Sequence, residues 1–363
     1  MLSPSLRPAL KLPIVVIGAG QAGLSSAYHL KHLGLDPLKD FIVLDGAPEP
    51  GGAWQYRWPS LTLTTVNGVR DLPGLAFSDF ASDTSIKASV AVPHYFAAYE
   101  EHFGLKVQRP AKVSVVCDRG ERLRVESDIG IFSAQGIINA TGTWEKPYIP
   151  AYPGAETFGR QQLHTKDYVT ADAFAGKHVL VVGGGISAIQ LLDEISQVTK
   201  TTWVTRTPPR FRQGPFDEEA GRKAVAMVEE RVRAGLPPNA VVSVTGLPLT
   251  PAIVAMRERG ALERQEMFAE ITPDGVRWAD GRTLAVDVIL WCTGFRSALD
   301  HLAPLQIRED SGGIVMTGRL ATQVAKDPRV HLVGYGPSAS TIGANRAGGA
   351  AARELTDYLG LRA

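Results

Sequence analysis

The chain has 363 residues, of which 44% are hydrophobic and 21% charged, and its formal net charge is +1 at pH 7. This length exceeds what one hydrophobic core usually supports, so two domains are expected. A charge this close to zero creates no long-range field that would gather nucleic acid or anionic lipid, so neither is expected as a partner. The two cysteines, Cys117 and Cys292, are far apart, which argues against a disulfide framework and against a metal cluster. No metal is predicted.

The first apolar run covers residues 14–17 and breaks at once into glycines. It is interpreted as a first strand and not as a signal peptide or a membrane span. Together with the absence of a disulfide framework, this makes the cytoplasm the expected location.

The first strand, a glycine-rich turn and a helix follow one another over residues 14–30, which is typical of the opening of a βαβ unit. In the turn, Gly18 permits a tight bend, Gly20 lets the backbone approach a pyrophosphate, and Gly23 lets helix and strand pack closely. Asp45 ends the next apolar run, where a carboxylate accepts hydrogen bonds from ribose hydroxyls; the alternative is a turn or capping aspartate. This order of elements predicts a dinucleotide site.

The chain is expected to leave this first domain and to return to it later. Residues 111–116 and 123–127 predict antiparallel strands, and residues 136–140 predict a buried strand. Three prolines and a glycine in residues 147–154 predict an extended linker out of the domain. A second crossing is expected near residues 286–294, after surface helices of a middle domain within residues 215–270.

A second strand, turn and helix cover residues 178–198, with glycines at 183 and 185 and alanine at the third position, 188. Here the next strand ends at Arg206 and Thr207, with no acid to hold a ribose. An arginine fork accepts a 2′-phosphate, so NADPH is favoured over NADH, although NADH is not excluded; the alternative is an exposed arginine without a ligand.

Two dinucleotide sites, one followed by Asp45 and the other by Arg206, suit a permanently held flavin and a visiting nicotinamide. The expected fold is α/β, with two Rossmann-like domains, three layers and an antiparallel β excursion. Residues 1–165 and 290–363 would form the FAD-binding domain, and residues 166–289 a smaller NAD(P)H-binding domain inserted into it.

Other segments complete a resemblance to the compact bacterial type of the flavin-containing monooxygenases, which are class B flavoprotein monooxygenases. Residues 51–54 are similar to the family's GGxW segment, residues 139–142 and 291–294 to its two ATG-type segments, and residues 334–349 to its C-terminal flavin-side segment. The family pattern F-x-G-x-x-x-H-x-x-x-Y is matched by Phe158, His164 and Tyr168, with Arg160 in place of the glycine. His164 has the alternative of a structural linker histidine.

The resemblance implies that NADPH reduces FAD and that O2 then forms a C4a-hydroperoxide, which oxygenates a soft nucleophile such as a sulfide or amine of a small molecule. Asn67 lies where the family places an asparagine near the flavin, with an Asn-Gly turn as the alternative. The expected FAD-binding residues are Gly18, Gly20, Gln21, Ala22, Gly23, Asp45, Gly52, Trp54, Thr141, Gly142, Thr341 and Ile342. The expected NADPH-binding residues are Gly183, Gly185, Ile186, Ser187, Arg206 and Thr207.

Several alternatives stay open at this stage. A flavin disulfide reductase of the thioredoxin-reductase type is set aside, because Cys117 and Cys292 cannot form a C-x-x-C pair. A Baeyer-Villiger enzyme that oxidises ketones, an NADPH oxidase that releases hydrogen peroxide, and a non-catalytic redox sensor that binds nucleotides all remain. The sequence does not determine the oligomeric state, and a homodimer is one option.

Overall fold

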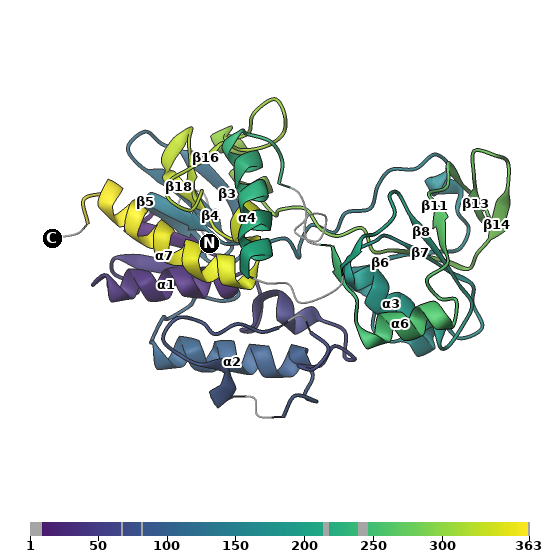
Figure 1. Ribbon diagram of the computed structural model, residues 1–363. Helices are drawn as coiled ribbons and strands as arrows, with labels where there is room; N and C mark the ends of the chain where they lie inside the picture. Colours follow the sequence, from purple (N-terminus) through teal and green to yellow (C-terminus); the bar gives the residue numbers. More distant parts are fainter. Residues whose placement is uncertain (1–8, 67, 81–82, 213–217, 239–245, 362–363) are drawn as a thin grey trace. The chain divides into compact units, whose positions relative to one another are not determined.

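Two units of structure make up the chain, for which a computed structural model describes residues 9–66, 68–80, 83–212, 218–238 and 246–361 (Figure 1). Unit 1 combines residues 1–145, 225–239 and 297–363, and unit 2 combines residues 146–224 and 240–296. Each unit contains its own sheet with a core of parallel strands, and the two units are described separately below.

The centre of unit 1 is a set of parallel strands whose carboxyl-terminal halves are buried. In spatial order these strands are β2 (Phe41–Leu44), β1 (Leu10–Ile17), β5 (Gly130–Asn139) and β18 (Asp327–Leu332). Antiparallel strands extend the sheet: β17 (Gln323–Val324) and β16 (Met316–Thr317) beyond β18, and β4 (Leu123–Ser127) and β3 (Val113–Asp118) from the first half of β5. The predicted antiparallel excursion is therefore present.

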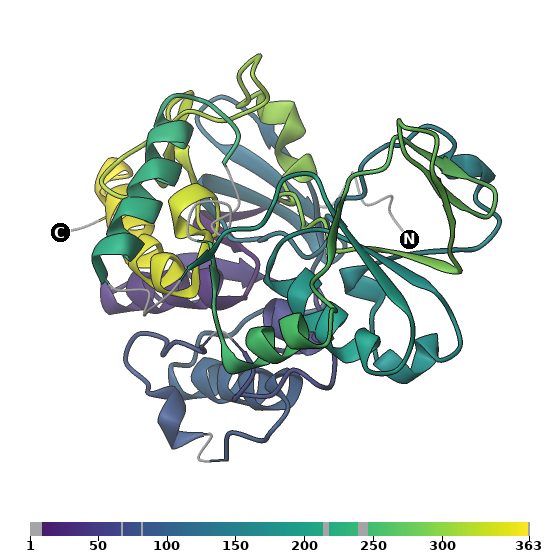
Figure 2. The same cartoon turned by 45° about the vertical axis from the view of Figure 1, so that its right-hand side comes forward.

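Helices cover one face of this sheet, where α1 (Gln21–His32) and α7 (Thr341–Tyr358) lie side by side (Figures 1 and 2). They approach closely because Gly348 has no side chain: a Cβ there would lie 2.7 Å from Ser25 Oγ. Helix α2 (Ala88–His102) packs into the same core. On the other face, apolar residues of β3, β4 and residues 299–316 form a second core. This arrangement confirms the predicted three-layer α/β fold. The short 3-10 helices of unit 1 are η2 (Gly52–Tyr56), η3 (Phe77–Asp79), η7 (Asp300–Leu305) and η8 (Gly336–Ala339).

A histidine in the sheet of unit 1 makes its stability depend on pH. His331 on β18 is fully buried, and its Nδ1 shares a hydrogen bond of 3.1 Å with Thr322 Oγ1, whereas its Nε2 has no partner among the described residues. Burial lowers the pKa of His331 to about 3. The unfolded chain binds a proton there near pH 6.5, so between these values the unfolded state holds more protons. This contribution to stability is present above the unfolded pKa and is lost as pH falls towards 3.

We expect His331→Asn, which keeps a partner for Thr322 but does not titrate, to flatten this dependence. The free energy of unfolding should lose up to about 1.4 kcal/mol per pH unit of its slope between pH 6 and pH 4. Denaturant unfolding at several pH values measures the slope. His94→Gln, at an exposed position, serves as the control and should leave it unchanged. An identical slope in the His331 variant and the parent would contradict the expectation.

Unit 2 is built on a sheet in which every strand is parallel to its neighbours. In spatial order its strands are β11 (Arg264–Glu266), β8 (Thr201–Thr205), β7 (Val179–Val182), β15 (Val288–Trp291) and β6 (Gln161–His164). The remaining elements are α3 (Ile186–Ser196), α6 (Pro251–Glu258), β9 (Phe211–Arg212), β10 (Leu247–Pro248), η4 (Ala155–Thr157), η5 (Thr165–Asp167), η6 (Ala171–Phe174) and an antiparallel sheet of β12 (Glu270–Thr272), β13 (Gly275–Arg277) and β14 (Thr283–Ala285). Strands β9 and β10 pair in a small parallel sheet of their own. A shared core of buried aromatic and aliphatic side chains joins the five-stranded parallel sheet to the antiparallel sheet.

Helix α4 (Glu218–Arg233) differs from the expectation of a surface helix of the middle domain. Its residues from 225 onward cluster with unit 1, and Val232 is fully buried in the core of that unit. A Cβ at Gly336 would lie only 2.9 Å from Val232 Cγ1, so the glycine makes room for this side chain. The described part of the chain contains no helix that is both long enough and apolar enough to cross a membrane.

Candidate functional site

The first glycine-rich turn joins β1 to α1 at the carboxyl edge of the parallel strands of unit 1. Gly18 has a φ of +97°, and a Cβ there would lie 2.6 Å from the carbonyl oxygen of Ala140. At Gly23, a Cβ would lie 1.9 Å from the carbonyl oxygen of Gly18. Nothing lies within 4 Å of the Cβ position of Gly20. The protein itself therefore requires the first and third glycines, whereas the second faces open space, as expected where a ligand crosses the turn.

The start of α1 adds a second feature that suits a pyrophosphate. Gly20 is the N-cap residue, no side chain caps the helix, and its first turn contains no acidic residue. By contrast, Thr250 caps α6 and Ser340 caps α7 through side-chain oxygens. The first N–H groups of a helix have no partner within it and favour an anion. The turn and the uncapped helix together fit the pyrophosphate of FAD.

Asp45 lies at the end of β2, beside this turn, and is held in place by a residue that the sequence did not point to. Its Oδ2 accepts hydrogen bonds from Arg109 Nε at 3.3 Å and Nη2 at 3.0 Å. Arg109 is also bound by Glu100 at 2.6 Å. Burial opposes the charge of Arg109, but the hydrogen bonds and charges of Glu100 and Asp45 raise its pKa above the usual value. Arg109 thus fixes the orientation of a carboxylate at the position expected for ribose binding.

Other segments expected at the flavin meet the same turn. A Cβ at Gly52 would lie 3.0 Å from Gly20 Cα, which places the start of η2, and with it the GGxW segment, against the turn. Trp54 on η2 is half-buried and packs against the core of unit 1. Gln21 at the start of α1 donates a hydrogen bond to Asn345 Oδ1 at 2.8 Å, which links α1 to the beginning of α7, where Thr341 and Ile342 are the first two residues. Asn67 lies outside the described residues.

A hydrogen-bonded chain behind Thr141 and Gly142 is a further feature that sequence reasoning missed. His301 Nε2 donates to Asn139 Oδ1 at 2.7 Å, and Asn139 Nδ2 donates to Thr141 Oγ1 at 3.0 Å. Thr141 Oγ1 in turn donates to the carbonyl oxygen of Ala298 at 2.7 Å. Burial lowers the pKa of His301 to about 4, so the imidazole is neutral at pH 7 and its tautomer is set by the bond to Asn139. This series of hydrogen bonds anchors the loop that follows β5.

The second glycine-rich turn, in unit 2, has the same construction between β7 and α3. Gly183 has a φ of +136°, and a Cβ there would lie 2.3 Å from the carbonyl oxygen of Cys292. Gly185 is the N-cap residue of α3, its Cβ position has nothing within 4 Å, and no side chain caps the helix. Ile186 and Ser187 are the first residues of α3, so their N–H groups are available to a ligand. Trp203 on β8 donates from Nε1 to Gly183 O at 2.7 Å and fixes the turn.

Arg206 and Thr207 follow β8 directly, at the same carboxyl edge as this turn. Arg206 is exposed and forms no ion pair within the described part of the chain. Two hydrogen bonds hold the backbone on either side of Arg206. Arg264 Nε donates to Thr205 Oγ1 at 2.6 Å, and Thr205 Oγ1 donates to the carbonyl oxygen of Thr207 at 2.9 Å. A guanidinium that forms no ion pair with the described residues, on a backbone held by these hydrogen bonds, fits the 2′-phosphate of NADPH.

The residues that match the family pattern lie together in unit 2. His164 is buried at the end of β6; its Nε2 donates to Gly294 O at 2.9 Å, and its Nδ1 accepts from Lys166 N–H at 3.1 Å. Burial lowers its pKa, so it is a neutral histidine that fixes the second ATG-type segment. Arg160 stands in place of the pattern's glycine and directly precedes β6. It forms an ion pair of 2.5 Å with Asp287, which directly precedes the neighbouring strand β15.

The two cysteines do not form a redox-active disulfide pair. Both cysteines are free; Cys117 lies on β3 in unit 1 and Cys292 follows β15 in unit 2. Burial raises the pKa of Cys292 to about 12, which keeps this thiol protonated and unreactive. Among the described residues, no group of three or more His, Cys, Asp or Glu side chains is placed to hold a metal ion.

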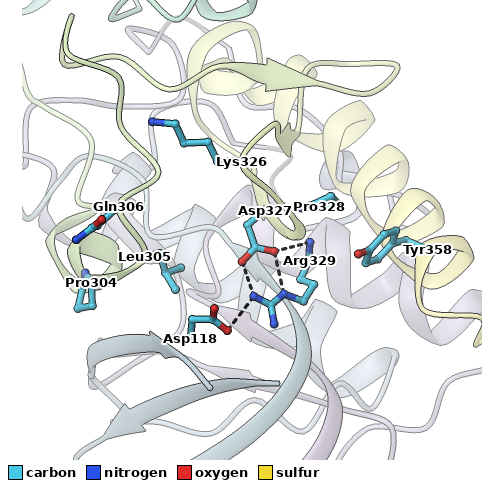
Figure 3. A pocket seen from close by; sticks show the side chains of 9 residues that line it. All are labelled: Asp118, Pro304, Leu305, Gln306, Lys326, Asp327, Pro328, Arg329 and Tyr358. Atoms are coloured by element: carbon cyan, nitrogen blue, oxygen red, sulfur yellow. Dashed lines mark hydrogen bonds and ion pairs between the residues drawn. The ribbon is translucent and has the colours of Figure 1, made fainter. Parts of the chain in front are cut away.

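A cavity of about 600 Å³ lies elsewhere in unit 1 and is not part of this chemistry (Figure 3). Its residues Lys326, Asp327 and Arg329 lie where β18 begins, which is the edge of the parallel strands opposite the glycine-rich turn. Arg329 has an acceptor for each guanidinium nitrogen: Asp327, Asp118 and the carbonyl oxygen of Gly120. Since ligands of open α/β sheets bind at the carboxyl edge, this cavity is not a candidate cofactor site.

Comparisons with known proteins agree with this geometry. The family model described as pyridine nucleotide-disulphide oxidoreductase matches residues 15–236. The solved flavin-containing monooxygenase of Stenotrophomonas maltophilia has a TM-score of 0.81 and 37% identity, covering 96% of this chain and 99% of that one. A flavin monooxygenase variant from the same organism, with a neighbouring glutamine and histidine replaced by arginine and threonine, gives the same values.

Two curated relatives are more distant. The uncharacterized oxidoreductase CzcO of Bacillus velezensis is 26% identical over 83% of this chain and 86% of that protein. A Baeyer-Villiger monooxygenase of Streptomyces coelicolor is 30% identical over 61% of this chain and 44% of that protein.

The fold and the paired turns define an oxidoreductase with two dinucleotide-binding domains. Within that class, the chain belongs to the flavin-containing monooxygenase family, as the sequence resemblance predicted. It is an FAD-dependent NADPH monooxygenase, and both cofactors expected from the sequence are those of the family.

Proposed function

We propose that this enzyme uses NADPH and O2 to oxygenate a soft nucleophile, a sulfide or an amine of a small molecule, through a C4a-hydroperoxyflavin. Unit 1 binds FAD in this proposal, and unit 2 binds NADPH. One observation carries it: two uncapped helices, each behind a glycine-rich turn, are followed by groups of opposite charge, Asp45 in one unit and Arg206 in the other. A carboxylate suits the ribose of FAD, and a free guanidinium suits the 2′-phosphate of NADPH.

The residues of unit 1 bind and orient in this proposal. N–H groups at the start of α1 hold the pyrophosphate, and Asp45, fixed by Arg109, accepts hydrogen bonds from the ribose. Thr141 and Gly142 border the flavin ring, and the series of hydrogen bonds that begins at His301 anchors them. Asn67 is proposed to donate its amide to the reacting oxygen. The bound flavin supplies the oxygen chemistry, so no paired carboxylates or triad are needed.

Unit 2 presents the reductant. The N–H groups of Ile186 and Ser187 hold the pyrophosphate of NADPH, and Arg206 with Thr207 holds the 2′-phosphate.

Anaerobic reduction by NADPH, followed by rapid mixing with oxygenated buffer, tests the proposal. The flavin absorbance should lose its oxidised bands on addition of NADPH and then show a long-lived flavin–oxygen adduct. With a sulfide present, the adduct should decay faster and sulfoxide should form in proportion to the NADPH consumed. Direct return to oxidised flavin with release of hydrogen peroxide would show an NADPH oxidase, and flavin that stays oxidised under NADPH would support a redox sensor.

A further inference from the structure

Arg57, beside the GGxW segment of unit 1, has no counter-charge among the described residues. Arg57 follows η2 directly, and its backbone N–H donates to Trp54 O at 3.2 Å. Its guanidinium carbon lies 5.8 Å from the ring centre of Trp54 and 5.1 Å from that of Trp144. The side chain is half-buried between the two segments that carry these indoles.

Burial lowers the pKa of Arg57, and neither a carboxylate nor any other charged group of the described residues offsets that effect. Two indole faces stabilise a guanidinium only in part, and the N–H groups at its edge have no acceptor among the described residues. Arg57 is partly removed from water, and a partly buried charge is more stable when a partner of opposite charge is present. The loaded enzyme is therefore expected to bring an anion to Arg57.

The cofactor anions have other partners in the proposed function. The pyrophosphate of FAD lies at the uncapped start of α1, the pyrophosphate of NADPH at that of α3, and the 2′-phosphate at Arg206. Arg57 nevertheless lies close to the flavin side, because η2 touches the first turn through Gly52 and Trp144 follows the Thr141–Gly142 loop. Among the ligands of the proposed function, the substrate is the one whose possible negative charge has not been assigned a partner.

We propose that Arg57 binds a carboxylate of the substrate, so that this enzyme oxygenates small molecules that carry both a soft nucleophile and a carboxylate. This inference rests on the proposed function. Tyr56, an exposed ring stacked on Trp144 at 5.8 Å between ring centres, supplies an apolar surface for the rest of the molecule. In the reaction, a sulfide sulfur takes one atom of O2 to give the sulfoxide. The other atom leaves as water with two protons, and NADPH supplies the two electrons.

The test compares (phenylthio)acetate with its uncharged methyl ester on the FAD-loaded enzyme. For the parent, kcat/KM for sulfoxide formation should be at least about 10-fold higher for the acid, as expected for a charge-assisted bidentate contact. Arg57→Met should bring the ratio of acid to ester close to one, and Arg57→Lys should restore part of it. Arg282 makes a similar contact, 5.2 Å from the ring centre of Trp278, but is exposed in unit 2. Arg282→Met should leave the ratio unchanged.

Three results would overturn the inference: a parent enzyme with no preference for the acid, an Arg57→Met variant with the parent's ratio, or an Arg57→Met variant that purifies without FAD. The last would assign the guanidinium to the cofactor. A binding titration separates this inference from the proposed function, because the flavin absorbance of the oxidised enzyme is followed with (phenylthio)acetate and no turnover is needed. Binding that depends on Arg57, without any sulfoxide, would support the inference and contradict the proposed function.

Discussion

Replacing Gly20 by valine is expected to yield a folded protein that does not retain FAD. Gly20 has φ −78° and ψ −169°, a conformation that valine adopts readily, and its Cβ position has nothing within 4 Å. The new side chain would instead occupy the space over the start of α1, where the pyrophosphate is expected. We expect the Kd for FAD to rise at least about 100-fold, or about 2.7 kcal/mol.

The ratio of flavin to protein absorbance after purification, and titration of the apoprotein with FAD, measure this effect. Thermal unfolding of the apoprotein should be similar for the variant and the parent, because nothing lies within 4 Å of the Cβ position of residue 20. Gly185→Val is the matched control: its turn has the same construction, but in unit 2. That variant should keep its FAD and lose reduction by NADPH. Stoichiometric FAD in the Gly20 variant with an unchanged Kd would show that the pyrophosphate lies elsewhere.

The contrast between Gly20 and its neighbours also shows how far the sequence could predict this enzyme. The glycine-rich turns were predictable from the local spacing of residues. The roles assigned to Gly18 and Gly23 agree with the structure, where an added Cβ would lie 2.6 Å and 1.9 Å, respectively, from a backbone carbonyl oxygen. Strands with a strong apolar pattern, such as β4 and β15, were also predictable. A glycine-rich turn is a local structure, so nearby residues determine it.

The residues that the sequence did not reveal act across long separations. Arg109 binds Asp45 from 64 residues away, and His301 reaches Asn139 across 162 residues. No periodicity connects such pairs, because only the folded sheet brings them together. The same reason applies to α4: its mixed charges are typical of a surface helix, and the burial of Val232 depends on Gly336, which lies far along the chain. Arg57 was missed as well, because only the fold brings it between the two segments that carry Trp54 and Trp144.

Arg206→Ala is expected to lower the preference for NADPH over NADH by about 10-fold to 100-fold, which corresponds to the loss of hydrogen bonds between charged groups. Arg206 forms no ion pair with the described residues, so its removal breaks no salt bridge among them. Only the ligand with the 2′-phosphate loses an interaction. Arg206→Glu should lower the preference further, because a carboxylate repels the phosphate and accepts hydrogen bonds from the free ribose hydroxyls of NADH.

Steady-state kcat/KM for each nicotinamide, at low and at moderate ionic strength, gives this ratio. The parent's preference should weaken as salt is added, since an exposed guanidinium and a phosphate are screened. Arg277, an exposed arginine of unit 2 paired with Glu270 at 3.0 Å, is the control, and Arg277→Ala should keep the parent's ratio. A parent enzyme that uses NADH as well as or better than NADPH would remove Arg206 from the phosphate site. In that case, the uncapped start of α3 would hold the pyrophosphate of either nucleotide, and the selectivity would be set by residues other than the pair that follows β8.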